Sequence, residues 1–183
     1  MLSASRLSQG TKGFSLIEIL STLALILIIA SFTWQTFSRF FFISKQQTIK
    51  AEIKSLLYYA HQEAYANDSP VAFCYYTKTG SCSDTPTQQL AVVRMADVHH
   101  PFSQVTIPAS LAVYFKSYPI YRQHLIFLPG VHGNNDNATL WLCSKKSVIP
   151  YWVLTLSQVG KMQMLKPHAD GLFYNSQGKL ISC

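Results

Sequence analysis

Residues 13–34 read GFSLIEILSTLALILIIASFTW, an apolar run in which the only formal charge is the carboxylate of Glu18. No charged residue occurs from residue 19 to residue 38. A helix rises about 1.5 Å per residue, so this stretch would extend roughly 30 Å, the thickness of a bilayer's hydrocarbon core. A carboxylate costs on the order of 2.5–3.5 kcal/mol at mid-bilayer and usually marks a function there. Glu18 is therefore expected to have a cationic partner.

Two simpler interpretations of this run are open. A cleaved secretory signal also has a basic start and an apolar core, and the pair Ala30-Ser31 could imitate its cleavage site. The run is long for such a core, however, and a glutamate inside a discarded segment would have no purpose. A plain single-pass anchor explains the length of the run but does not explain the combination of Gly13, Phe14 and Glu18.

Residues 12–18, KGFSLIE, resemble the class III signal of type IV pilins and pseudopilins, in which a basic leader ends in glycine and a glutamate follows the new N-terminus. The resemblance implies cleavage between Gly13 and Phe14 by a prepilin peptidase, and N-methylation of Phe14. It also implies a filament in which Glu18 meets the terminal amine of a neighbouring subunit. That amine would be the missing cation.

Length and charge suggest one small globular domain beyond the apolar run. The chain has 183 residues and a formal charge of +7, a mild excess that is compatible with an anionic membrane surface or with nucleic acid and requires neither. Basic residues in the leader favour a cytoplasmic N-terminus in the inner membrane. Together with the pilin-like signal, this predicts that the chain beyond about residue 38 lies in the periplasm.

Residues 39–66 continue a helical period without proline or glycine. Apolar residues recur at three- and four-residue steps and predict a stripe that packs on a globular domain: Ile49, Ile53, Leu56, Leu57, Ala60 and Ala64. Asn67, Asp68 and Ser69 before Pro70 predict the end of the helix. We therefore expect one long helix with an apolar half and an amphipathic half.

The chain after Pro70 has the texture of short strands separated by glycine, proline, asparagine and serine. The runs expected to form strands are residues 71–76, 90–95, 105–107, 111–115, 124–128, 139–143, 151–156 and 161–165. Helix first and strands afterwards predict an α+β protein in which the helix covers an antiparallel β-sheet domain. The order of the strands does not follow from the sequence.

Several of these runs, taken in order, resemble the GspH/FimT family of minor pilins and pseudopilins. The matching segments are VAFC at 71–74, GSC at 80–82, HLIF at 124–127, TLWLC at 139–143 and VLTLS at 153–157. The resemblance implies a type IV pilin-like fold and a structural role at the tip of a type II secretion pseudopilus or a type IV pilus. Its implied partners are other pilins, which contact the N-terminal helix.

The sequence departs from this family in two places. Some DNA-binding members end in Gly-Arg-x-Arg, whereas residues 160–163 read GKMQ. The chain also continues to a terminal Cys183, and residues 172–174 and 179–181 flank NSQG at 175–178, which predicts an added hairpin.

The four cysteines form an even set that permits three disulfide connectivities. Cys74 and Cys82 bracket a short loop, which favours a bridge between them, and Cys143 would then pair with Cys183. A zinc site is the alternative, but the sequence lacks the usual ligand spacings. We expect structural disulfides and no metal.

Other candidate sites carry weaker signals. His99 and His100 precede Pro101 and are expected in a surface loop, and NNDN at residues 134–137 predicts a hairpin turn rather than a calcium loop. No catalytic or cofactor-binding motif is present, so neither an enzyme nor a cofactor is expected. Five lysines of the C-terminal third could converge to bind nucleic acid: Lys145, Lys146, Lys161, Lys166 and Lys179. An ordinary solvated face is the simpler interpretation.

The two resemblances together imply a minor pseudopilin of a type II secretion system. The alternative is a minor pilin of FimT or FimU type that acts in pilus biogenesis or DNA uptake. The expected segments are a leader at 1–13, a transmembrane or filament-core helix half at 14–38, an amphipathic half at 39–66 and a periplasmic β domain with a C-terminal hairpin at 67–183.

Overall fold

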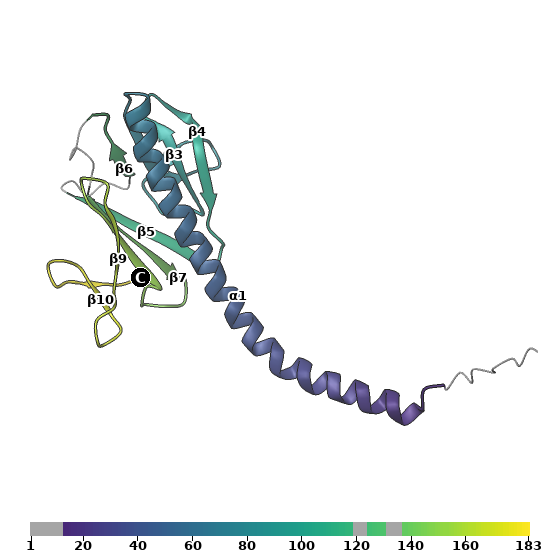
Figure 1. The fold of residues 1–183 in the computed structure, drawn as a ribbon. Helices are drawn as coiled ribbons and strands as arrows, with labels where there is room; N and C mark the ends of the chain where they lie inside the picture. The colour runs from purple at the N-terminus through teal and green to yellow at the C-terminus, as the bar shows by residue number, and fades with distance from the viewer. Residues whose placement is uncertain (1–12, 119–123, 131–136) are drawn as a thin grey trace, which may run out of the picture. The chain divides into compact units, whose positions relative to one another are not determined.

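The structure, a computed structural model, describes residues 13–118, 124–130 and 137–183, without the side chains of residues 32–36. The chain divides into two compact units, Met1–Lys45 and Gln46–Cys183. Helix α1 (Leu16–Ala66) begins in the first unit and ends in the second (Figure 1). The sequence predicted that residues 14–38 form a membrane-spanning half of this helix. In the part of the chain that the structure describes, no helix has the length and apolar composition needed to cross a membrane.

α1 ends in a hydrogen-bonded cap just before Pro70. The N–H of Ser69 donates to the carbonyl of Ala64 at 3.3 Å. Asp68 has a φ of 45°, the left-handed conformation that closes a Schellman-type helix end. The helix therefore stops at the turn-forming segment that predicted its end.

Five strands form an antiparallel sheet, here called sheet A: β1 (Val71–Tyr76), β2 (Cys82–Ser83), β3 (Gln89–Arg94), β4 (Asp97–Thr106) and β6 (His124–Phe127). β1 lies at the centre, with β3 along one edge and with β6 and β2 in succession along the other. Every residue of β1 is buried, because separate apolar clusters cover its two faces.

β4 overturns one prediction. The sequence placed His99 and His100 in a loop because Pro101 follows them, and it predicted a strand only at residues 105–107. His99, His100 and Pro101 all lie within β4. Proline is tolerated there because β4 is the edge strand of sheet A and its pairing with β3 shifts register beside Pro101.

The remaining strands form sheet B and a small hairpin. Sheet B is antiparallel, in the order β5 (Leu111–Tyr118), β7 (Asn137–Ser144), β8 (Trp152–Leu156) and β9 (Met162–Leu165). β10 (Phe173–Tyr174) and β11 (Leu180–Ile181) pair as the C-terminal hairpin that the sequence predicted. The predicted turn at residues 134–137 lies mostly outside the described residues. The sequence did not predict that the β domain consists of two main sheets.

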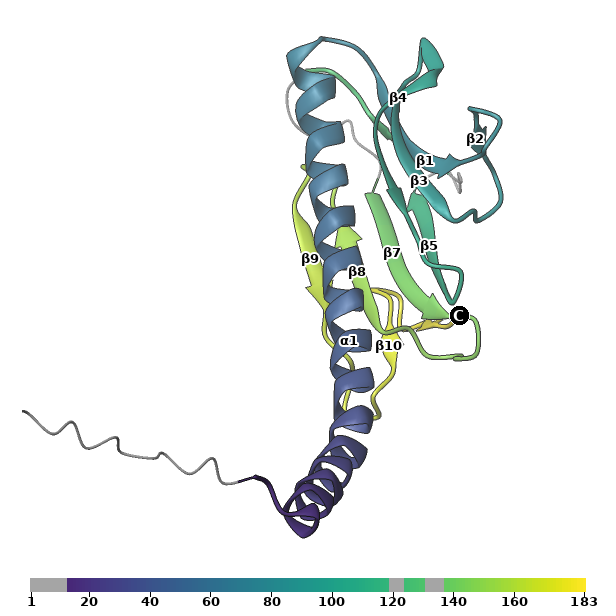
Figure 2. The ribbon, with the colours of Figure 1, turned by 90° about the vertical axis from the view of Figure 1, so that its right-hand side faces the viewer.

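The second half of α1 packs on one face of each sheet, here called the inner face. Six apolar side chains of this half are buried: Ile49, Ile53, Leu56, Leu57, Ala60 and Ala64. They form one cluster with residues of β1, β3, β5, β6, β7 and β8, and Figure 2 shows this half of α1 running along sheet B. Full burial of a large aliphatic side chain contributes about 1.5–3 kcal/mol. The stripe predicted from helical periodicity is thus a major part of the core.

Tyr75 links sheet A to sheet B. Its hydroxyl donates to the carbonyl of Val113 (3.1 Å) and accepts from the N–H of Phe115 (3.2 Å), both on β5. Its ring stacks on Phe115 with 4.5 Å between the centroids. β5 is an edge strand, so the carbonyl of Val113 and the N–H of Phe115 have no neighbouring strand to bond with. The hydroxyl of Tyr75 serves as their hydrogen-bond partner. Burial raises the pKa of Tyr75, so the phenol stays neutral.

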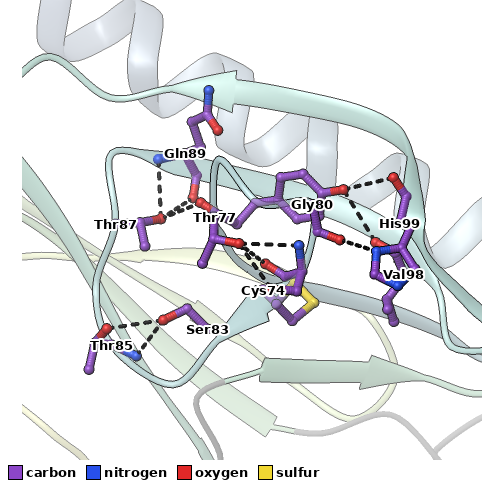
Figure 3. The surroundings of a disulfide bond; sticks show 12 residues. Cys74, Thr77, Gly80, Ser83, Thr85, Thr87, Gln89, Val98 and His99 are labelled. Carbon is purple, nitrogen blue, oxygen red and sulfur yellow. Dashed lines mark hydrogen bonds between the residues drawn. A yellow bond between two sulfur atoms is a disulfide. The ribbon is translucent and has the colours of Figure 1, made fainter.

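A disulfide joins Cys74 on β1 to Cys82 on β2. The loop between them is held against β4, because Nδ1 of His99 lies 2.7 Å from the carbonyl oxygen of Gly80 (Figure 3). The hydroxyl of Tyr76 also donates to the carbonyl of His99 at 3.0 Å. His99 therefore has a structural role that its predicted loop position did not suggest.

A second disulfide joins Cys143 on β7 to the terminal Cys183, so both predicted pairings are present. It fixes the C-terminal hairpin on the outer face of sheet B, opposite the face that α1 covers (Figure 1, yellow). There Phe173 is buried in a cluster with Trp141, and Ile181 packs against that cluster. The extension thus covers part of a face that would otherwise be apolar and exposed.

Tyr75→Phe should lower the free energy of unfolding by about 1–3 kcal/mol, because it leaves the carbonyl of Val113 and the N–H of Phe115 buried without a partner. Tyr58→Phe is a matched control, since Tyr58 is 60% exposed on α1, and it should change stability by less than about 0.5 kcal/mol. Urea denaturation measures both. Equal effects of the two variants would contradict the role assigned to the Tyr75 hydroxyl.

Replacing both Cys143 and Cys183 with alanine should destabilise the protein more than replacing Cys74 and Cys82. The sequence separations are 40 and 8 residues, and the chain-entropy relation gives about 4 and about 2.5 kcal/mol respectively. Urea unfolding of the two double variants under non-reducing conditions measures the difference. A larger loss of stability in the variant without Cys74 and Cys82 would contradict this prediction, and it would mean that local packing outweighs the entropy of loop closure.

Candidate functional site

The start of α1 places a carboxylate close to the predicted processing site between Gly13 and Phe14. α1 begins at Leu16, and the N–H of Glu18 donates to the carbonyl of Ser15 at 3.0 Å. Glu18 lies in the first turn, where a negative charge interacts favourably with the helix dipole. Among the residues that the structure describes, no cationic side chain lies within ion-pair distance of its carboxylate. Phe14 is 81% exposed.

The first part of α1 presents a nearly continuous apolar surface. Every leucine and isoleucine between residues 16 and 29 is exposed. The hydroxyls of Ser21, Thr22 and Ser31 donate to carbonyls of the preceding helical turn, at 2.7–2.9 Å. Their polar groups are thereby satisfied within the helix. An exposed apolar surface of this extent is typical of an interaction site.

A second candidate site is a groove of about 1040 Å³ between the outer face of sheet B and the C-terminal hairpin. Directly paired residues of neighbouring strands project to the same side of a sheet. One such row crosses all four strands of sheet B and lines the groove: Lys116 on β5, Thr139 on β7, Thr155 on β8 and Gln163 on β9. The floor of the groove therefore includes a polar row, beside the apolar side chains of Trp141 and Leu165.

Two of the five lysines predicted to converge line this groove: Lys161, in the turn between β8 and β9, and Lys179, in the turn between β10 and β11. The other three, Lys145, Lys146 and Lys166, are exposed but are not lining residues. The five lysines therefore do not share one groove. Lys116, which was not among the predicted residues, also lines the groove.

Lys116 was missed because the expected strand ended at residue 115. β5 continues to Tyr118, and its residues alternate between buried and more exposed positions throughout. This alternation places Lys116 on the outer face of sheet B. The alternation of residues in the sequence, followed for three more positions beyond residue 115, would have predicted this placement of Lys116.

Two exposed carboxylates have pKa values below their ordinary range. Hydrogen bonding to His100, at 2.9 Å, lowers the pKa of Asp97. Hydrogen bonds from the N–H of Leu172 and from the hydroxyl of Tyr174 lower the pKa of Asp170. Within the described ranges, no group of three or more His, Cys, Asp or Glu side chains could hold a metal ion. These carboxylates stabilise local turns and strands.

Solved structures similar to this chain include proteins of the class that the sequence resemblance implied. A crystal structure of the type IV minor pilin FimU from Pseudomonas aeruginosa aligns with a TM-score of 0.47 and 19% identity, covering 66% of this chain and 87% of that chain. The minor pseudopilin EpsH from the type II secretion system of Vibrio cholerae aligns with a TM-score of 0.46 and 16% identity, covering 69% of this chain and 93% of that chain. No family model and no curated protein matches the chain.

Proposed function

We propose that this chain is a minor subunit of a type IV pilin-like filament, and specifically a minor pseudopilin of a type II secretion system. The observation that carries the proposal is the exposed apolar first part of α1, with the single carboxylate of Glu18 in its first turn. The class III signal resemblance at residues 12–18 supports the same assignment. The role is structural rather than catalytic.

In the proposed filament, the first part of α1 packs among the equivalent helices of other subunits. Each exposed leucine or isoleucine that becomes buried contributes about 1.5–3 kcal/mol. The hydroxyls of Ser21, Thr22 and Ser31 already have partners within the helix, so burying them leaves no polar group unsatisfied. Apolar packing thus provides the affinity for the filament.

The pairing of Glu18 provides the register. Cleavage after Gly13 by a prepilin peptidase leaves a new amine on Phe14, and we assign the methylated amine of a neighbouring subunit as the cation that Glu18 lacks. A buried carboxylate without a partner is strongly destabilising. Only the axial position that brings amine and carboxylate together is then stable.

The β domain is proposed to lie in the periplasm. The two disulfides support this location, because disulfides persist in oxidising compartments and are rare in the bacterial cytosol. Attachment of the unassembled subunit to the inner membrane stays a prediction from the sequence.

A secretion pseudopilus is favoured over a DNA-uptake pilus because residues 160–163 read GKMQ, whereas DNA-binding members of the family resembled have a second basic residue at this ending. Lysines of the C-terminal third are also divided between the groove and other surfaces. A FimT- or FimU-type minor pilin with weak nucleic-acid binding is the alternative assignment.

Glu18→Ala should reduce the share of this subunit in sheared filaments by about tenfold or more, because the variant cannot pair with the neighbouring amine. Glu52→Ala is the matched control, since Glu52 is exposed later on the same helix. Immunoblots of filament and whole-cell fractions measure incorporation, and both variants should accumulate normally in cells. Normal incorporation of Glu18→Ala would refute the register role.

A further inference from the structure

We propose that the groove between the outer face of sheet B and the C-terminal hairpin binds a polysaccharide chain that carries carboxylate groups. This site is separate from the helix surface assigned to filament assembly. The groove is open along the sheet face and holds about 1040 Å³, enough for several sugar rings. Its ligand follows from the charge and the hydrogen-bonding capacity of its lining.

The charge of the lining selects an anion. Lys116, Lys161 and Lys179 line the groove and are exposed, and no aspartate or glutamate is among its described lining residues. The nearby carboxylate of Asp170 already accepts hydrogen bonds from Tyr174 (2.7 Å) and from the N–H of Leu172 (2.9 Å). Three lysines from three separate turns and strands thus favour an anionic ligand.

The uncharged lining combines apolar surface with hydroxyls and amides, which suits sugar rings, because their faces are apolar and their edges carry hydroxyl groups. Most polar residues of the groove are uncharged, and the floor row contributes Thr139, Thr155 and Gln163. Gln177, in the hairpin turn, adds a second side-chain amide. Hydroxyls and amides both donate and accept, as sugar hydroxyls do, whereas phosphate or carboxylate groups alone require only donors.

Two other anionic polymers fit less well. An acidic peptide that binds a sheet gains affinity mainly through backbone hydrogen bonds to a strand edge, whereas the polar row of this groove lies on the face of sheet B. Nucleic acid would need free ring faces for its bases. Among the described tyrosine and tryptophan residues that line the groove, however, only Tyr118 is largely exposed, so successive bases would find a single exposed ring. Trp141 is buried and stacked near Tyr114 (5.9 Å between centroids), and the ring of Tyr174 meets His168 edge-on (5.0 Å).

Trp141 offers a reporter for binding. It lines the groove, it is only 8% exposed, and its indole N–H is buried without a hydrogen-bond partner among the described residues. A ligand that enters the groove changes the surroundings of this indole. Its fluorescence should therefore change on binding.

The test titrates the full chain, in a non-ionic detergent at low salt, with oligomers of polygalacturonate and follows tryptophan fluorescence and calorimetric heat. The triple variant Lys116→Gln, Lys161→Gln, Lys179→Gln should bind about tenfold or more weakly. The control triple variant Lys145→Gln, Lys146→Gln, Lys166→Gln removes the same charge outside the groove. Its affinity for polygalacturonate should stay within about twofold of that of the unmodified chain. Gln163→Ala should weaken binding without changing charge. Neutral dextran should bind poorly to every form, and circular dichroism shows whether each variant is folded.

Equal weakening by the two triple variants would overturn the site, because it would reflect net charge alone. No effect of Gln163→Ala would overturn the recognition of hydroxyl groups. Displacement of polygalacturonate by lower concentrations of duplex or single-stranded DNA, or of poly-glutamate, would overturn the choice of polysaccharide. Absence of polygalacturonate binding would overturn the proposal as a whole.

Discussion

Packing of the second half of α1 against the inner faces of both sheets is the interaction on which the β domain depends. Ile53 and Leu57, at the middle of the stripe, are 0% and 1% exposed. Each sheet alone would leave its inner face in water, and the strands of a two-layer domain are stable only when such a face is covered. Tyr75 adds a second link, since its hydroxyl bonds the open edge of β5 directly to sheet A.

The two halves of α1 differ in chemistry, and this difference separates their roles. From residue 46 to residue 66 the helix has an apolar stripe at helical spacing, which its own domain buries, and its other residues are exposed or half-buried. Between residues 16 and 31, apolar side chains are exposed all around the helix, and the exceptions are three hydroxyls bonded to the backbone and the carboxylate of Glu18. Folding of the domain satisfies the second half, and assembly with other subunits is proposed to satisfy the first.

Local features of the sequence predicted more than its long-range pairings. Periodicity predicted the stripe from Ile49 to Ala64, and turn chemistry predicted the helix end before Pro70. The short loop between Cys74 and Cys82 predicted the first disulfide, which left the other two cysteines to form the second. β4 was partly missed, since Pro101 is acceptable only at an edge strand with a shifted register, and edge position is a property of the whole sheet. The groove was missed because its floor joins four strands, and only the strand order shows that Lys116, Thr139 and Gln163 lie in one row.

The central claim is that the first part of α1 is a processed filament helix whose new terminus meets Glu18. Mass spectrometry of the protein purified from cells that assemble the filament tests it most directly. The account predicts a mature chain that begins at Phe14, carries one added methyl group on its α-amine and retains both disulfides. A chain that begins at Met1, or one that begins at Ser31 as a secretory signal would leave it, would contradict the account.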